Sequence, residues 1–208
     1  IKLNIRERSF FLNSSDIDLL IFNEKQELSN VNIFIGLDAI FKQEDVIKKI
    51  IINSKENKVR TLLKFIKAYK INIPAIYLEN IIQDGNIIYN VIVEYEENNT
   101  NQIELSGKII DANINLFGKE KFKNIDFNFK YKNKNLNLTD LKLKYKDVNF
   151  TSENITTKIR NDVIDINGDI KSKIDLNLIS KFSNYDLKKF IDKKILFNSK
   201  SNFSIKLN

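Results

Sequence analysis

The sequence predicts a mainly β protein, in which an antiparallel sheet has one apolar and one charged face and two or three short helices accompany it. The first observation is a strict alternation of apolar and polar residues, which places the two kinds on opposite faces of a strand. The second is the frequency of Gly, Asn and Asp turn signals between these runs. The third is that helical spacing occurs in only two longer stretches. Clean alternation is typical of antiparallel sheets with one solvated face.

The stretch Asn124–Phe150 shows this alternation most clearly. It reads NIDFNFKYKNKNLNLTDLKLKYKDVNF, with an apolar residue at every second position. The pattern shifts by one residue at Thr139-Asp140, which indicates a bulge or a turn.

The N-terminal part predicts a strand pair, Asp16–Asn23 and Leu28–Leu37, joined by the short polar loop Glu24–Glu27. Gly36 is expected to end the second of these strands. Leu37–Lys42 has the spacing of one helical turn, and Val46–Ile52 predicts a third strand.

Two stretches change to helical spacing. Asn57–Tyr69 places Val59, Leu62, Leu63, Ile66 and Tyr69 on one stripe, with Ser54 or Asn57 as the N-cap and Pro74 preventing extension. We expect this helix to pack on the sheet rather than to act as a lid. Asn184–Lys194 predicts the second helix, with Leu187, Phe190 and Ile191 on one side.

The rest of the chain predicts strands. Ile76–Tyr95 reads as two strands around Gln83–Asn86, Ile103–Leu178 as about seven short strands, and Ser201–Leu207 as a further one. The expected turn signals are Gly118, Asn133-Lys134, Lys146-Asp147, Asn161-Asp162 and Gly168-Asp169, with a bulge at Gly107. We divide the chain into an N-terminal strand and helix portion, 1–74, and a repetitive strand portion, 75–208. Because the sequence begins at Ile1 and contains no Met, we expect a fragment of a longer protein.

The composition argues against an enzyme. The chain has no Cys, His or Trp, so it has no disulfide, no Cys or His metal ligand and no usual nucleophile–base pair. The tight carboxylate pairs are Asp16/Asp18 and Asp162/Asp165, and the first lies on the solvated face of a strand. We therefore expect no catalytic residue, no metal site and no cofactor.

The charge does not by itself indicate a nucleic-acid partner. The net charge is +7, but the 30 Lys residues are scattered beside Asp and Asn, and Arg occurs only four times. The abundance of Ile, Lys and Asn is typical of a low-GC genome. We expect no nucleic-acid binding, since no dense cluster or known binding motif is visible. No apolar run is long enough for a transmembrane helix.

The apolar face must be covered. About twenty apolar side chains of Ile103–Leu178 lie on it, and each is worth roughly 1.5–3 kcal/mol when fully buried. Two short helices offer too few apolar residues for this. Either two such faces meet in a sandwich or closed barrel, or a curved open sheet forms a groove that holds acyl chains.

A resemblance favours the groove. The stretch DIDLLIFNEKQELSNVNIFIGLDAIFKQEDVIKKIIINS (Asp16–Ser54) resembles the AsmA-like family of Gram-negative envelope proteins, the AsmA, YhdP and TamB type. LNLTDLKLKYKDVNFTSENITTKI and DVIDINGDIKSKIDLNLIS look like the repetitive strand region of that family. The resemblance implies a curved, twisted, taco-like antiparallel sheet with an apolar inner groove.

The same resemblance implies a function. Such a chain is a segment of a periplasmic protein, anchored to the inner membrane outside this sequence, which conducts phospholipid between inner and outer membranes and supports outer-membrane integrity. Its partners are phospholipid acyl chains and, through missing segments, the two membranes. The alternative is a structural or adhesive β-sandwich surface module without lipid cargo. The residues expected to line the groove are Phe127, Phe129, Leu136, Leu138, Leu143, Phe150, Ile166, Leu176 and Leu178.

Overall fold

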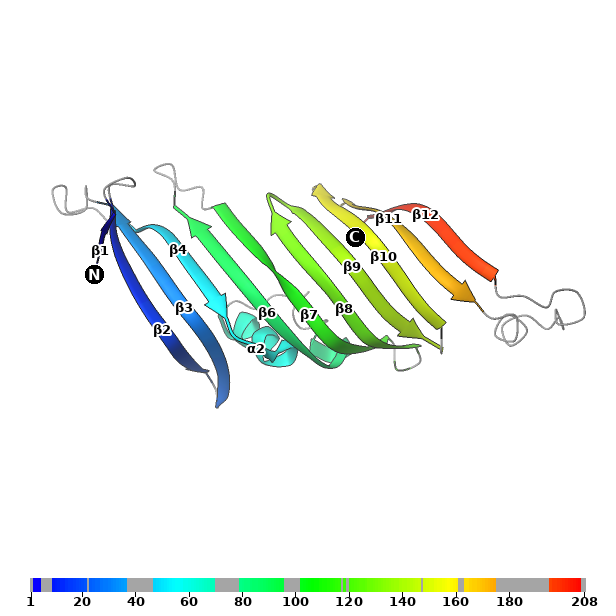
Figure 1. Ribbon diagram of the computed structural model, residues 1–208, viewed down its shortest axis with the longest axis horizontal. Helices are drawn as coiled ribbons and strands as arrows, with labels where there is room; N and C mark the ends of the chain where they lie inside the picture. The colour runs from blue at the N-terminus through cyan, green and yellow to red at the C-terminus, as the bar shows by residue number, and fades with distance from the viewer. Residues whose placement is uncertain are drawn as a thin grey trace, which may run out of the picture.

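The chain forms one open, curved antiparallel sheet, as a computed structural model shows (Figure 1). The structure describes residues 2–4, 9–21, 23–36, 47–69, 79–95, 102–116, 118, 120–146, 148–160, 163–174 and 195–206. The predicted mainly β fold class is confirmed. The elements are β1 (Lys2–Asn4), β2 (Ser9–Ile21), β3 (Glu24–Gly36), β4 (Ile47–Ser54), β5 (Asn57–Lys58), α2 (Val59–Tyr69), β6 (Ile82–Glu94), β7 (Gln102–Leu116), β8 (Glu120–Lys132), β9 (Asn135–Tyr145), β10 (Val148–Arg160), β11 (Val163–Ile174) and β12 (Ile195–Lys206).

The strands follow one another across the sheet in the order of the sequence. Each pairs with the next in antiparallel fashion, except that β4 pairs directly with β6 and the short β5 pairs with β6 alone. In Figure 1 the ladder runs from β1 and β2 at one edge to β12 at the other, with α2 beside the ends of β4 and β6. The portions 1–74 and 75–208 therefore contribute to a single sheet, and the described strands do not form two facing sheets.

The predicted N-terminal strand pair is confirmed, but the predicted loop Glu24–Glu27 between the two strands is wrong. Glu24 already pairs with Ile21, so Glu24–Glu27 belongs to β3 and the turn is tighter than expected. Asn23 makes this turn possible because it takes a positive φ of 60°. The second strand ends at Gly36 as predicted, and the predicted third strand is β4.

The predicted number of short strands is also wrong. The described part of Ile103–Leu178 holds five long strands, β7 to β11. Gly168-Asp169 lies inside β11 and Gly85 inside β6, so neither is a turn. Gly85 is required there, because a Cβ would lie 2.7 Å from the Cα of Ala112. These positions are close approaches of neighbouring strands, and such glycines resemble turn signals in sequence.

Other turn predictions are confirmed where the structure describes them. Gly118, Asn133, Lys134 and Lys146 lie between strands with positive φ. Gly107 is no bulge, since it pairs regularly with Tyr89 and Phe129. The predicted Ser201–Leu207 strand is the second half of β12. Leu37–Lys42, Asn161-Asp162, Asp147 and the predicted helix Asn184–Lys194 lie outside the described residues.

Several strands carry a bulge at which the apolar alternation changes phase. Four of these positions have left-handed backbone: Asp16 in β2, Asp111 in β7, Asn124 in β8 and Asp140 in β9, with φ of 52°, 48°, 50° and 56°. The strand registers shift near three of them, between β7, β8 and β9. We call these four residues the crease. The bulge predicted at Thr139-Asp140 is confirmed, and its strand continues through it.

The crease keeps one face of the sheet apolar. In β9, Leu138 precedes Asp140 at an even position and Leu141 follows it at an odd position, yet both lie on the same face. Asp and Asn suit such positions because their short polar side chains tolerate left-handed backbone. Each bulge also bends its strand and increases its twist. The crease therefore supports both the curvature of the sheet and its single apolar face.

We predict that Asp140→Val destabilises the protein by about 1–2 kcal/mol, because a β-branched residue strains left-handed backbone. Asp140 is exposed, so burial does not contribute to this change. Asp140→Asn is the control, since Asn tolerates the backbone and can still accept the hydrogen bond that Asn128 Nδ2 donates over 2.9 Å. Urea unfolding measures both variants. Equal losses in the free energy of unfolding of the two variants would contradict a role for the left-handed backbone at Asp140.

Candidate functional site

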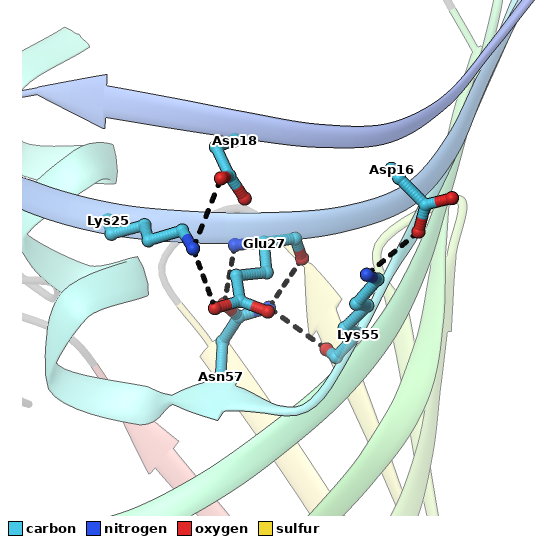
Figure 2. A network of polar contacts seen from close by, with 6 residues as sticks. All are labelled: Asp16, Asp18, Lys25, Glu27, Lys55 and Asn57. Carbon is cyan, nitrogen blue, oxygen red and sulfur yellow. Dashed lines mark hydrogen bonds and ion pairs between the residues drawn. The ribbon is translucent and has the colours of Figure 1, made fainter.

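The chain leaves the sheet after Ser54 and turns onto the apolar face as α2. The pairing of β3 with β4 ends at Leu28 and Ser54. Beyond this pair, the side chain of Asn57 forms hydrogen bonds with the β3 backbone, as a neighbouring strand would. Its Oδ1 accepts from the Glu27 N–H over 2.7 Å, and its Nδ2 donates to the Glu27 carbonyl over 2.8 Å and to the Lys55 carbonyl over 2.9 Å (Figure 2). Asn57 thus satisfies the backbone of β3 where β4 ends.

The predicted helix caps are therefore wrong. Asn57 is engaged with Glu27 and Lys55, and Ser54 Oγ accepts from the Tyr89 N–H over 2.7 Å. Both side chains form hydrogen bonds with backbone groups of strands. Their position in the sequence just before a helix does not reveal these partners.

Helix α2 packs on the sheet, as predicted. Val59 and Leu63 are 5% and 7% exposed, and they join a core cluster with sheet residues of β3, β6, β7 and β8. These sheet residues are Leu28, Ile87, Tyr89, Ile109, Ala112 and Ile125. Leu62 packs against the cluster, whereas Ile66 is 41% exposed. The helix covers the apolar face from β3 to β8 only in part.

A buried polar pair lies within this cluster. Gln26, 1% exposed, donates from Nε2 to the hydroxyl of Tyr89 over 3.1 Å. Burial raises the pKa of Tyr89, so its hydroxyl stays protonated at neutral pH. Gln26 Oε1 has no hydrogen-bond partner among the described residues.

Acidic residues tie α2 to the strands beneath it. Glu24 accepts from Thr61 Oγ1 over 3.2 Å and pairs with Lys64, and the hydrogen bond from Lys64 lowers the pKa of Glu24. Lys58 pairs with Asp84 over 3.0 Å. These exposed pairs orient the helix more than they stabilise it.

The Asp16/Asp18 pair is engaged separately by two lysines (Figure 2). Asp16 pairs with Lys55 over 2.8 Å, whereas Asp18 pairs over 3.1 Å with Lys25, which also contacts Glu27. The two carboxylates do not converge on a common point. Asp162 lies outside the described residues, so the second pair is not placed.

An apolar hollow of about 360 Å³ lies beside the region that α2 covers. It is lined from strands β8 to β12 by Phe122, Leu141, Leu143, Tyr145, Phe150, Thr151, Ser152, Ile170 and Ser199. The rings of Phe122 and Tyr145 stack with centroids 4.8 Å apart. The volume falls at the lower end of the range for small-molecule sites, so the hollow suits part of an apolar ligand.

One polar group in the wall is buried without a hydrogen-bond partner among the described residues. Ser152 is 3% exposed, and its Oγ makes no hydrogen bond among the described residues. By contrast, the buried Ser172 Oγ donates to the Asn149 carbonyl over 2.8 Å. A buried hydroxyl without a partner costs free energy, so a ligand with a hydrogen-bonding group would gain by reaching Ser152.

Seven of the nine predicted lining residues are described by the structure, and they lie in three places. Leu143 and Phe150 line the hollow. Phe127 and Phe129 pack against the core cluster, with ring centroids 6.3 Å apart. The half-buried residues Leu136, Leu138 and Ile166 lie in β9 and β11, with Leu138 opposite Phe129. Leu176 and Leu178 lie outside the described residues.

Sequence reasoning did not select the other residues of the hollow. Phe122 and Ile170 continue the apolar alternation, so a rule that followed each strand through its phase change would have found them. Ser152 also lies in phase, two residues after Phe150. A serine in an apolar series is the available signal, but alternation alone does not mark it as functional.

On the polar face, Glu104 bridges two lysines of the next strand. Its Oε1 is 2.7 Å from Lys130 Nζ and its Oε2 is 3.0 Å from Lys132 Nζ. The hydrogen bonds from Lys130 and Lys132 lower the pKa of Glu104 below its usual value of 4.5.

No group of three or more metal-ligating side chains occurs among the described residues. No described helix is long and apolar enough to cross a membrane. The fold and the hollow define an open-sheet protein with a partly covered apolar face. No protein-family model, curated protein or solved structure matches the chain.

We predict that Glu104→Gln removes a pH-dependent contribution to stability. Because the folded-state pKa of Glu104 is lowered, its contribution is fully present above pH 4.5 and is lost as the pH falls through the folded-state value. The wild type should melt at a higher temperature than the variant at neutral pH, and the difference should vanish in acid. Thermal unfolding from about pH 7 to about pH 3 measures this. A difference that persists unchanged in acid would refute the assignment.

Proposed function

We propose that this chain is a segment of an AsmA-like protein of the cell envelope, whose apolar face binds phospholipid acyl chains and conducts them between the inner and outer membranes. The observation that supports this is the apolar hollow, which opens on a sheet face that α2 covers only in part. The proposal includes a periplasmic location and an inner-membrane anchor outside this sequence. The resemblance at Asp16–Ser54 supports these two points.

The chemistry of the face suits an acyl chain. Leu141, Leu143 and Phe150 offer methyl groups and a ring without charge, and the attraction of such surfaces for hydrocarbon is non-directional. An acyl chain gains roughly 0.8 kcal/mol for each methylene that it buries. A non-directional attraction lets a chain shift along the strands without breaking specific contacts.

Ser152 adds a polar point to this surface. An ester carbonyl of a phospholipid could accept the hydrogen bond that the Ser152 hydroxyl does not make within the described chain. This would place a headgroup near β10 and its acyl chain along the wall that Phe122 and Leu143 form.

The alternative is a structural or adhesive surface module without lipid cargo. The sandwich version of this alternative requires a second sheet against the apolar face, and the described strands form one sheet. The two functions differ in what fills the hollow, which is lipid in the lipid-conducting segment and protein in the surface module.

We predict that Phe150→Asp weakens acyl-chain binding at least about 10-fold, because it places a carboxylate in the hollow. Phe150 lines the hollow but is not among the residues packed against the core cluster, so the fold should persist. Titration with a fluorescent fatty acid and mass spectrometry of co-purified phospholipid measure the effect.

Ile88→Asp is the matched control. Ile88 is 39% exposed and alternates with the buried Ile87 and Tyr89, so it lies on the polar face. This control should keep the affinity of the wild type. Circular dichroism checks that both variants are folded. If the folded wild type holds no lipid and binds no fatty acid, the proposal is refuted and the module without cargo remains.

A further inference from the structure

Ser152 lies where the pairing of β10 with β11 is interrupted. The register of the two strands shifts between Thr151 and Ile155. Residues 152–154 of β10 therefore lie opposite only residues 169–170 of β11, which makes this place a β-bulge. A bulge redirects side chains and is common beside functional sites. Ser152 is the first residue of the bulge, and it lines the hollow.

The lining of the hollow changes in character along the strands. Ser152 pairs with Leu141, whereas Tyr145 lies four residues further along β9 and stacks on Phe122. Four residues of a strand span about 13 Å, so the serine and the aromatic pair stand at opposite ends of the hollow. An elongated ligand with a hydrogen-bond acceptor at one end and hydrocarbon beyond it matches this arrangement.

Ser152 and Ser172 are alike in burial but differ in hydrogen bonding. They are 3% and 4% exposed. Ser172 Oγ donates to the Asn149 carbonyl over 2.8 Å, whereas Ser152 Oγ has no partner among the described residues. A hydroxyl that gives up its hydrogen bonds to water without replacing them costs free energy. A ligand that brings an acceptor to Ser152 recovers this cost, and a purely hydrocarbon ligand does not.

We infer that Ser152 makes the hollow selective for acyl lipids, in which a carbonyl joins the chain to the headgroup, over alkyl ether lipids. The inference rests on the proposed function, because it concerns the chains proposed to bind there. A carbonyl oxygen projects from the chain and can accept from the hydroxyl, whereas an ether oxygen lies in line with the chain and accepts more weakly. Leu143 and Phe150 do not make this distinction, since apolar groups attract both kinds of chain alike.

The same hydrogen bond would give the apolar face one fixed stop. Apolar attraction is non-directional, so it does not favour one position of a chain over its neighbours. A hydrogen bond to Ser152 is directional, and it changes an equilibrium by only about 2- to 10-fold. A lipid would therefore pause with its carbonyl at the bulge without being trapped there.

The test compares palmitoyl lysophosphatidylcholine with its ether-linked counterpart, hexadecyl lysophosphatidylcholine. The two lipids differ only where the carbonyl of the first is a methylene in the second. Each is used, below the concentration at which it forms micelles, to displace a fluorescent fatty acid from the protein. The wild type should bind the palmitoyl lipid at least about 5-fold more tightly. Ser152→Ala should abolish this preference, because the affinity for the palmitoyl lipid falls to that for the ether.

Ser172→Ala is the matched control. It removes the same hydroxyl from an equally buried serine that does not line the hollow, so the preference for the palmitoyl lipid should persist. Thermal unfolding without lipid gives a second measurement. Ser152→Ala should melt at or above the temperature of the wild type, because it removes a hydroxyl without a partner. Ser172→Ala should melt below it, because it removes a hydrogen bond.

A further pair of variants keeps the shape of the side chain constant. Ser152→Thr and Ser152→Val introduce side chains of nearly equal size, and only the first retains a hydroxyl. The threonine variant should keep the preference for the palmitoyl lipid and the valine variant should lose it. Equal preference in the two folded variants would overturn the inference.

The outcomes separate this inference from the proposed function. Equal affinity of the wild type for the two lipids would overturn the selectivity and leave acyl-chain binding intact; it would indicate that a buried water molecule satisfies the hydroxyl. A preference that survives in Ser152→Ala, or that Ser172→Ala abolishes as well, would also overturn it. If the folded wild type binds neither lipid, the proposed function is refuted and the inference fails with it.

Discussion

The left-handed backbone of the crease is the constraint on which the rest of this structure depends. A strand of more than ten residues without a bulge would keep one face apolar only if every second residue along its whole length were apolar. Here the phase changes within β2, β7, β8 and β9, and a residue with positive φ at each change returns the apolar side chains to the same face. All four crease residues are Asp or Asn, whose short side chains tolerate this backbone. The bends that accompany the bulges curve the sheet.

The crease also separates the chemistry of the two faces. Phe122 and Leu143, which are close to the crease residues Asn124 and Asp140, line the hollow. Their sequence neighbours Lys123 and Lys144 lie on the opposite face of the sheet. A slip of one residue would exchange these sets. An apolar wall and a polar, charged surface therefore arise on opposite faces of the same segments of β8 and β9.

Alternation predicted the sheet, the amphipathic α2 and the phase change at Asp140, because each depends on residues close in sequence. It did not predict that Gly85 and Gly168 lie inside strands, since their contacts with Ala112 and Ile155 come from neighbouring strands. It also misassigned Asn57, which resembles a helix cap but binds the backbone of Glu27, thirty residues away. Within the candidate site, Leu143 and Phe150 were found by pattern. The buried hydroxyl of Ser152 depends on tertiary packing, which no local pattern encodes.

The uncovered apolar side chains are mostly half-buried, because residues of adjacent strands shield one another on the curved face. Phe127, Leu138 and Phe150 each have part of their surface covered before any ligand arrives. An acyl chain on this face would bury only the remaining part, so the free energy gained per residue is below that of full burial. Small gains at many similar positions give shallow minima along the strands. If the proposed function holds, such a surface would keep hydrocarbon out of water while allowing it to move, whereas one deep apolar pocket would retain it.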